Sequence, residues 1–193
     1  MNVILGSQSP RRQELLRGLD IDFVVRTIDG LEEHYPEPLQ GAGIPLFLAR
    51  QKASAFRPTL TNDDLLITAD TIVWLDGRVY GKPTDADDAR RMLRTLARRT
   101  HEVITGVCLT STKRQEAFSA TTQVTFANLS DAEIDYYVAK YRPFDKAGSY
   151  GVQEWIGYIG VESIAGSFYN VMGLPVQRLY QKLKEFGELR IKN

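Results

Sequence analysis

The run Leu65–Leu75 sets the strongest constraint on how this chain folds, because it is apolar on both sides of one carboxylate. Leu65-Leu66-Ile67 leads into Thr68-Ala69-Asp70-Thr71, and Ile72-Val73-Trp74-Leu75 follows. An acid between two apolar segments is costly to bury unless a cation, a metal or hydrogen-bond donors surround it. Asp70 is therefore either a structural anchor or a reactive group, and the rest of the sequence has to decide which.

A turn directly after this run gives Asp70 an expected neighbour. Asp76-Gly77 is a strong two-residue hairpin signal. With that turn, Thr71 faces Lys82 across the hairpin, so Lys82 is expected beside Asp70. Pro83 then ends the second strand, because proline has no N–H to continue a ladder.

The N-terminal segment has the features of an anion-binding helix start. A short apolar strand leads into Ser7 and Ser9, and Ser9-Pro10 predicts an N-cap followed by the first helical residue. Arg11 and Arg12 then fall in the first turn, where the helix dipole disfavours cations. A phosphate held by the hydroxyls, the backbone N–H groups and the guanidinium groups would remove this conflict. A capped helix with solvated arginines is the equal alternative.

Further acids and lysines extend this polar set. The acids are Glu32, Glu33 and Asp145, and the lysines are Lys52 and Lys146. A lone helical lysine is normally solvated, so Lys52 is weak support by itself. Cations together with several acids suit metal-assisted phosphoryl chemistry, in which carboxylates hold Mg²⁺ or Mn²⁺. The sequence has neither a P-loop nor a glycine-rich dinucleotide fingerprint. The residues alone therefore indicate a nucleotide or phosphoester enzyme that uses a divalent metal.

Composition narrows the class of protein. The chain has 193 residues, of which 43% are hydrophobic, enough for one globular domain or two lobes sharing a sheet. Its formal net charge is zero, so no direct nucleic-acid partner is expected. Cys108 is the single cysteine, which fits a reducing compartment. No segment approaches the roughly 20 apolar residues of a membrane span. We expect a soluble cytoplasmic protein without a membrane partner.

Caps, turns and β-rich runs predict the remaining elements. Helices are expected to start at Pro45, Thr84, Ser130 and Pro175; strands are expected over 21–27, 101–110, 115–127 and 158–164, and loops over 143–153 and 166–170. The arginines that end the helix after Thr84 have no interleaved aromatic residues, so a nucleic-acid patch there is the minor alternative.

Short motifs are spread from the first strand to the last helix. In chain order they are Ser7-x-Ser9-Pro10-Arg11-Arg12, Leu48-Ala49-x-x-Lys52-Ala53, Ala69-Asp70-Thr71, Lys82-Pro83, Thr100-His101-x-Val103-x-Thr105-Gly106-Val107, Asp145-Lys146-Ala147-Gly148-x-Tyr150-Gly151-x-Gln153 and Asn170-Val171-x-Gly173-Leu174-Pro175. Each motif alone is weak, but the set in this order is specific. Together they closely resemble the Maf family of house-cleaning nucleoside triphosphate pyrophosphatases, over nearly the whole chain.

The resemblance implies a fold and a reaction. The fold is α/β, similar to that of the ITP pyrophosphatases: a long, bent mixed sheet with flanking helices, forming two lobes around a cleft. Residues 1–193 are then a single Maf-like domain. The implied reaction is hydrolysis between the α and β phosphates of a nucleoside triphosphate, which gives the monophosphate and pyrophosphate. A homodimer is compatible with this resemblance.

The resemblance also implies roles for individual residues. Asp70 matches the catalytic base of the family. The positions linked to base choice hold Arg11, Thr71 and Gln153, which resembles the subgroup acting on dTTP and UTP. The residues expected at phosphate or metal are Ser7, Ser9, Arg12, Lys52 and Lys82 for phosphate, and Asp70 with Glu32 or Glu33 for Mg²⁺ or Mn²⁺.

Two rival functions stay open at this point. The first is the same chemistry on another base, such as 7-methyl-GTP or ITP. The second is a non-catalytic binding protein that restrains cell division, because the resemblance carries an association with septum formation.

The chain also departs from the family at Gly6, where alanine is frequent, and at Ala97-Arg98, where Ser-Gly is frequent. Both departures lie outside the implied chemistry.

Overall fold

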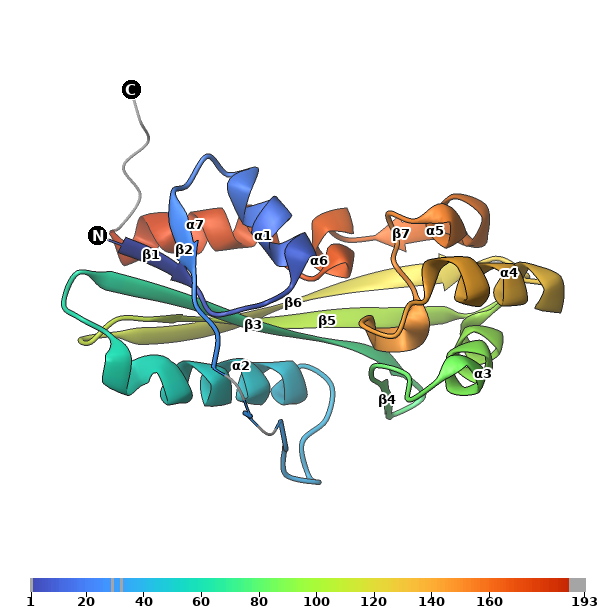
Figure 1. The fold of residues 1–193 in the computed structure, drawn as a ribbon, viewed down its shortest axis with the longest axis horizontal. Coiled ribbons are helices and arrows are strands. Elements are labelled where there is room, and N and C mark those ends of the chain that lie inside the picture. The colour runs from blue at the N-terminus through green and yellow to red at the C-terminus, as the bar shows by residue number, and fades with distance from the viewer. Residues whose placement is uncertain (1, 29, 32, 188–193) are drawn as a thin grey trace. The chain divides into compact units, whose positions relative to one another are not determined.

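The computed structural model describes residues 2–28, 30, 31 and 33–187 (Figure 1). The strands are β1 (Asn2–Leu5), β2 (Phe23–Val25), β3 (Asp64–Leu75), β4 (Arg78–Tyr80), β5 (Thr100–Thr110), β6 (Gln115–Phe126) and β7 (Val161–Ala165). The helices are α1 (Pro10–Arg17), α2 (Gly43–Phe56), α3 (Ala86–Leu96), α4 (Asp131–Tyr141), α5 (Trp155–Gly160), α6 (Phe168–Met172) and α7 (Val176–Phe186), with short 3₁₀ turns at Arg57–Thr59 and Ala147–Ser149.

The strands form one mixed, seven-stranded sheet in the order β2-β1-β3-β5-β6-β7, with β4 paired to β3. β1 runs parallel to β2 and β3, whereas the β3–β4 and β6–β7 pairs are antiparallel. Helices separate the parallel strands along the chain, as a parallel connection requires. The predicted α/β class with a mixed sheet is therefore confirmed.

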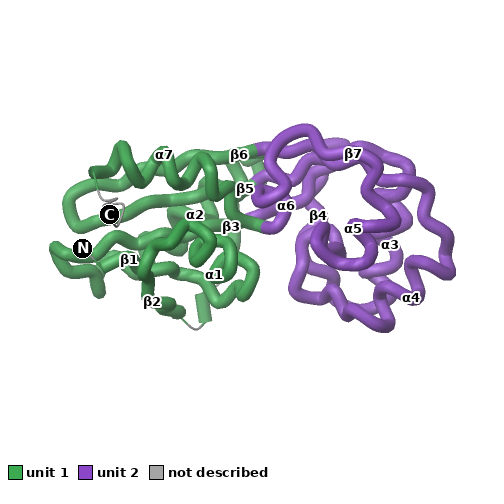
Figure 2. Tube along the Cα trace, turned by 90° about the horizontal axis from the view of Figure 1, so that it is seen from above, with its two compact units in different colours: residues 1–70, 105–120, 173–193 green, residues 71–104, 121–172 purple. Residues whose placement is uncertain are grey.

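The chain divides into two compact units (Figure 2). Unit 1 comprises Met1–Asp70, Thr105–Ala120 and Gly173–Asn193, and unit 2 comprises Thr71–Ile104 and Thr121–Met172. The boundary falls inside β3, β5 and β6, so each of these strands contributes residues to both units. Within the described residues, no helix is both long enough and apolar enough to cross a membrane.

The core of unit 1 joins α2 to the sheet. Ile4 and Leu66 from the parallel strands pack with Ala49, Ala53 and Phe56 of the helix and with Cys108 of β5. Cys108 is thus a buried packing residue, as predicted, and burial raises the pKa of its thiol. Small residues on the helix allow it to lie close to the strands.

Gly106 of β5 lies directly against the backbone at the start of α2. A Cβ at this position would lie 2.4 Å from the carbonyl carbon and oxygen of Pro45, and 2.5 Å from the nitrogen of Leu46. These are backbone atoms, which cannot move aside as a flexible side chain can. We expect Gly106→Ala to lower the free energy of unfolding by about 2–3 kcal/mol, as overpacking does in a close-packed core.

Urea unfolding followed by circular dichroism measures this effect. Gly81→Ala is the matched control, because a Cβ at Gly81 has no atom within 4 Å. An unfolding midpoint for Gly106→Ala equal to that of the control would show that the contact does not limit packing.

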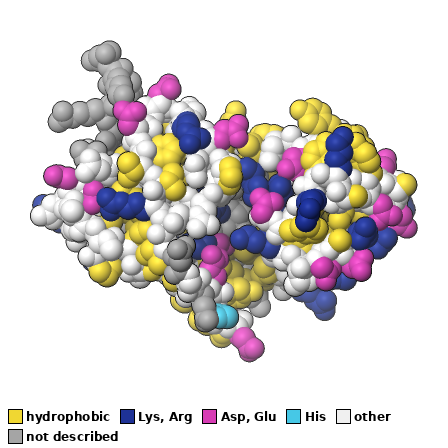
Figure 3. All heavy atoms as spheres, in the orientation of Figure 1, with side chains coloured by type: hydrophobic (Ala, Val, Ile, Leu, Met, Phe, Trp, Pro, Cys, Tyr) yellow, Lys and Arg dark blue, Asp and Glu magenta, His cyan; other side chains and the backbone are white. Residues whose placement is uncertain are grey.

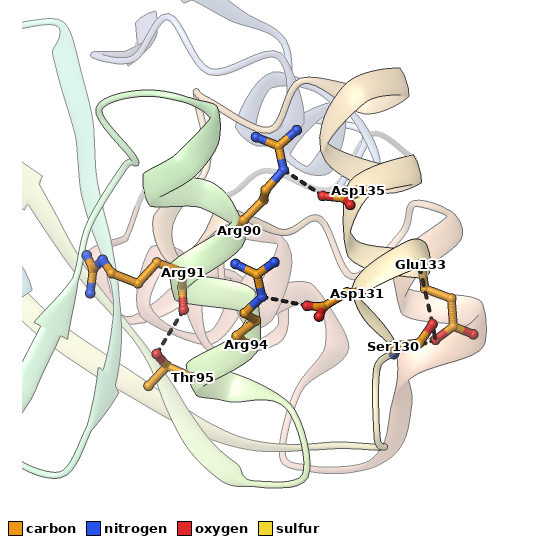
Figure 4. A network of polar contacts seen from close by, with 8 residues as sticks. All are labelled: Arg90, Arg91, Arg94, Thr95, Ser130, Asp131, Glu133 and Asp135. Atoms are coloured by element: carbon orange, nitrogen blue, oxygen red, sulfur yellow. Dashed lines mark hydrogen bonds and ion pairs between the residues drawn. The ribbon is translucent and has the colours of Figure 1, made fainter.

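In unit 2, α3 and α4 pack together and are joined by ion pairs (Figure 4). Arg90 Nε lies 2.6 Å from Asp135 Oδ1, and Arg94 Nε lies 2.6 Å from Asp131 Oδ1. Lys/Arg and Asp/Glu side chains interleave over this part of the face drawn in Figure 3. Exposed ion pairs of this kind stabilise the fold by about 0–1 kcal/mol each. They also offset the positive charge that a nucleic-acid patch on α3 would need.

Local signals predicted several element ends correctly. Ser9 caps α1 by accepting from the Arg12 N–H, and Ser130 forms the predicted capping box with Glu133 at the start of α4. The Asp76-Gly77 turn sets the expected register, since Val73 pairs with Tyr80 in the β3–β4 ladder. Both turn residues have positive φ, as the favoured hairpin turn requires.

Other expected elements were wrong. The N-cap of α3 is Asp85, because its carboxylate accepts from the Asp88 N–H at 2.8 Å, so Thr84 is not the cap. Residues 158–160 end α5 instead of starting a strand, and Gly157 N–H closes the first turn on Glu154 O at 2.8 Å. Residues 168–172 form α6 where a loop was expected, since Ser167 Oγ accepts from Asn170 N–H at 3.2 Å. In each case a side chain or backbone acceptor satisfies a helix start that the apolar pattern did not reveal.

One departure from the family pattern is visible in the backbone. Arg98 adopts φ 62°, a left-handed conformation that glycine takes without strain. Its N–H donates to Ala127 O at 2.9 Å, so the tight connection into β5 is kept despite the larger residue.

Candidate active site

The register of β1 against β3 places the start of the serine loop beside the middle of β3. Leu5 pairs with Ile67, and the Gly6 N–H donates to Ile67 O at 2.8 Å. Ser7 lies in the loop that begins directly after this point, at the carboxyl end of β1. Ligand sites in parallel sheets form at such carboxyl ends of strands.

The alternation of side chains along β3 and the turn of α2 together place Lys52 against Asp70. Thr68 and Asp70 lie on the same face of β3, since side chains alternate along a strand. Thr68 Oγ1 donates to Ala49 O at 2.7 Å, and Lys52 follows three residues later on the same side of α2. Lys52 Nζ then lies 2.7 Å from Asp70 Oδ1.

Lys52 also binds a second carboxylate. Its Nζ lies 3.1 Å from Glu33 Oε1, so one ammonium group is shared by two acids. The side chains of Lys52 and Asp70 are only 14% and 12% exposed, whereas that of Glu33 is 44% exposed. Lys52 is therefore not a solvated helical lysine. Asp70, which needed a partner in order to be buried, has one.

Arg12 is held by contacts to the serine loop and to the segment before α7. Its Nε donates to Gly173 O at 2.9 Å, and its NH1 group donates to Ser7 Oγ at 3.4 Å. Ser7 Oγ also accepts from the Ser9 N–H at 3.2 Å. No role was expected for Gly173, although it lies in the last of the sequence motifs.

Burial lowers the pKa of Arg12 below its ordinary value, and the charge of Arg11 acts in the same direction. The charges of Asp70 and Glu33 raise this pKa in opposition. A guanidinium group nevertheless stays protonated in a protein. Among the described residues, the charges of Arg12 and Lys52 thus act together on the carboxylates of Asp70 and Glu33, and cations placed in this way suit a polyanionic ligand.

The acids fit a divalent cation that takes its other ligands from substrate and water. In the part of the chain that the structure describes, no group of three or more His, Cys, Asp or Glu side chains is arranged to hold a metal. Mg²⁺ is commonly bound by one or two carboxylates together with substrate phosphates. Asp70 and Glu33 supply two carboxylates that already share a cation, the ammonium of Lys52. Glu32, the alternative ligand, lies outside the described residues.

Three predicted site residues belong to unit 2. Thr71 follows Asp70 in β3, and Gln153 lies in the loop before α5. The amide oxygen Oε1 of Gln153 is buried and has no hydrogen-bond partner among the described residues. Lys82 is exposed and follows β4.

The expected pairing of Thr71 with Lys82 is wrong. The ladder ends at the Val73–Tyr80 pair, because Gly81 O accepts from the Gly148 N–H at 3.1 Å and Pro83 has no N–H to donate. The cation that hydrogen-bonds to Asp70 is Lys52.

Comparison with known proteins agrees with these observations. Residues 2–186 match a family described as "Maf-like protein". The chain is 62% identical over 183 residues to a protein of Phocaeicola vulgatus named "dTTP/UTP pyrophosphatase", with 95% of each chain covered. It is 57% identical over 188 residues to a protein of the same name from Porphyromonas gingivalis, covering 96% of this chain and 94% of the relative.

A solved structure supports the fold alone. The Ham1 protein of Staphylococcus aureus superposes with a TM-score of 0.53 at 16% identity, covering 97% of this chain and 100% of that one. The family match covers most of the chain and includes every element from β1 to α7. This protein therefore belongs to the Maf family.

Proposed function

We propose that this protein is a nucleoside triphosphate pyrophosphatase that hydrolyses dTTP and UTP to the monophosphate and pyrophosphate. The observation that carries the proposal is the Lys52 ammonium shared by Asp70 and Glu33, with the charge of Arg12 acting on both acids. The names and the identity of the two relatives support the choice of substrates.

The cations of unit 1 bind the triphosphate. Arg12 is oriented by Gly173 O and Ser7 Oγ, so its fork is directed before substrate arrives. Planar guanidinium groups match phosphate oxygens in two parallel hydrogen bonds. Arg11 adds charge beside it, and we assign further phosphate contacts to Ser7, Ser9 and Lys82. Such fixed charges stabilise the transition state more than mobile solvent does.

Asp70 orients the attacking water and accepts its proton. Lys52 engages Oδ1 and so fixes the rotation of the carboxylate, which leaves Oδ2 to accept a hydrogen bond from water. The water attacks the α-phosphorus, the bond to the bridging oxygen breaks, and pyrophosphate leaves with its charge offset by Arg12 and Lys52. Mg²⁺ or Mn²⁺, when held by Asp70 and Glu33, neutralises charge on the phosphate oxygens.

We assign base selection to Arg11, Thr71 and Gln153. An amide can accept from the N3–H of uracil or thymine and donate to O4. The buried Oε1 of Gln153, without a partner in the described structure, supports this role because an unmade buried hydrogen bond favours a ligand that completes it.

Gln153→Ala is expected to raise KM for UTP by roughly threefold to tenfold, because one hydrogen bond to the ligand is lost. The value of kcat should change less than KM, since the phosphate contacts remain. Steady-state kinetics with a pyrophosphate-coupled assay measure both. An unchanged KM would show that Gln153 does not bind the nucleobase.

A pyrophosphate-release screen tests the proposal itself. The purified protein is incubated with dTTP, UTP, 7-methyl-GTP and ITP, in the presence of Mg²⁺ or Mn²⁺. We expect the largest kcat/KM for dTTP and UTP. A preference for 7-methyl-GTP or ITP would agree with the proposed reaction but show that the proposed substrates are wrong. No release from any nucleotide, together with tight binding of a protein or DNA, would favour the division-regulating alternative.

We further propose that residues 1–193 act as one catalytic domain in the cytoplasm. The family match spans 2–186, and three strands contribute residues to both units, which supports a single functional domain. Limited proteolysis followed by assay of the fragments tests this, because no fragment of a single domain should retain turnover.

A further inference from the structure

The hydroxyl of Tyr137 connects α4 to the loop that carries Gln153. The Tyr137 side chain is fully buried, with 0% of its surface exposed. Its hydroxyl donates to Glu154 Oε2 and accepts from the Gly151 N–H at 3.0 Å. Burial and the nearby Glu154 carboxylate raise the pKa of Tyr137, so the hydroxyl keeps its proton at physiological pH. One hydroxyl therefore binds the loop on both sides of Gln153.

Glu154 is held in place from two directions. Lys146 Nζ lies 3.1 Å from Glu154 Oε1, and the Lys146 side chain is only 9% exposed. A Cβ at Gly151 would lie 2.8 Å from Glu154 Cδ, so the carboxyl group packs directly against Gly151. The carboxylate, the lysine and the Tyr137 hydroxyl form one connected polar network, and such networks fix geometry when every member is satisfied.

The other end of the loop is fixed by a second contact. Tyr150 OH lies 2.7 Å from Nε2 of His101, and both residues are buried. Burial lowers the pKa of His101 to about 4, so this ring is neutral at pH 7. The loop is thus held at Tyr150, Gly151 and Glu154. Between them, Gln153 has a buried amide oxygen with no partner in the described part of the chain.

We propose that Tyr137 is a positioning residue for recognition of the nucleobase: through Gly151 and Glu154 its hydroxyl fixes the backbone that carries Gln153, and so sets the direction of that amide toward the N3–H and O4 edge of uracil or thymine. The inference rests on the proposed function. It adds a residue remote from the substrate, which the sequence motifs did not include. Preorganised contacts improve affinity because less freedom is lost on binding.

Tyr137→Phe removes only the hydroxyl and tests this role. We expect KM for UTP to rise about threefold to tenfold with kcat within about twofold of the wild type. In a Gln153→Ala background the same substitution should cause no further rise, because the amide that Tyr137 positions is absent. Tyr136→Phe is the matched control on the same helix, since its hydroxyl contacts Lys140 and its ring rests on Trp155. That control should leave both constants unchanged.

The outcomes separate the inference from the proposed function. If the wild type releases no pyrophosphate from any nucleotide, the proposed function fails. If the wild type is active and Tyr137→Phe leaves KM unchanged, or adds its full effect to that of Gln153→Ala, the positioning role is overturned. Should Tyr137→Phe fail to fold, Glu154→Met takes its place, because it removes the carboxylate that accepts from Tyr137 while Lys146 keeps Asp145 as a partner. The same non-additive rise in KM is then expected, and additivity again overturns the role.

Discussion

Asp70→Asn is expected to lower kcat for pyrophosphate release from UTP by about 10³-fold, because the carboxylate that accepts the proton of the attacking water is lost. The amide has nearly the same shape and keeps an oxygen for Lys52, whose ammonium also retains Glu33. The free energy of unfolding should therefore fall by no more than about 1 kcal/mol. Single-turnover release of pyrophosphate, together with urea unfolding of the same preparation, measures the two quantities.

Asp64→Asn is the matched control, because Asp64 is a buried carboxylate on the same strand. Its Oδ2 accepts from the Thr61 N–H at 2.9 Å, and this hydrogen bond lowers the pKa of Asp64. A lowered pKa in the folded state means that the ionised form stabilises the fold above the pKa of the unfolded chain, and that this stability is lost as the pH falls through the folded value. The control should lose stability near neutral pH and keep activity. Near-full activity of Asp70→Asn would rule out the proposed mechanism.

Much of the fold follows from short-range chemistry. The Ser9 cap, the Asp76-Gly77 turn and the Ser130 capping box each depend on residues no more than four apart, so the sequence predicts them directly. The short helices α5 and α6 could not be predicted in this way. With so few residues they have almost no periodic signal, and their starts depend on single acceptors, namely Glu154 O and Ser167 Oγ.

The sequence named candidate site residues but did not predict which of them pair with one another. The sequence identified Asp70, Lys52 and Glu33, yet it assigned Lys82 as the neighbour of Asp70. The actual partner depends on how α2 lies against the sheet, and long-range contacts of Ala49 with Thr68 and of Pro45 with Gly106 set this position rather than any local rule. A hairpin register can be extrapolated from its turn only as far as the ladder continues, and this ladder stops at Tyr80.

The polar network in unit 2 was missed for a related reason. Tyr137 and Glu154 lie on different elements, and Tyr137 belongs to an apolar helix face on which an aromatic residue normally means packing. The one available signal was Glu154 itself, an acid that directly follows the predicted base-selecting Gln153. Its partial burial favours a partner, just as the burial of Asp70 does.

Lys52→Met is expected to have the second large effect on activity. It removes the ammonium group shared by Asp70 and Glu33 and keeps the apolar part of the side chain. The carboxylates of Asp70 and Glu33 then lose the ammonium that lies 2.7 and 3.1 Å from them, and Asp70 is no longer held through Oδ1. We expect kcat/KM for UTP to fall by about 10²–10³-fold, as when one fixed electrostatic contact to the transition state is lost.

Arg50→Met is the matched control, since it removes an exposed cation from the same helix. It should change kcat/KM by less than about twofold, because exposed charges are screened by solvent. Lys52→Arg separates charge from geometry, since the guanidinium keeps the positive charge but is planar and longer than the ammonium. If the arginine variant recovers full activity, charge alone is sufficient and the fixed orientation of Asp70 is not needed. If it stays near the methionine variant, the 2.7 Å contact to Oδ1 is what the reaction requires.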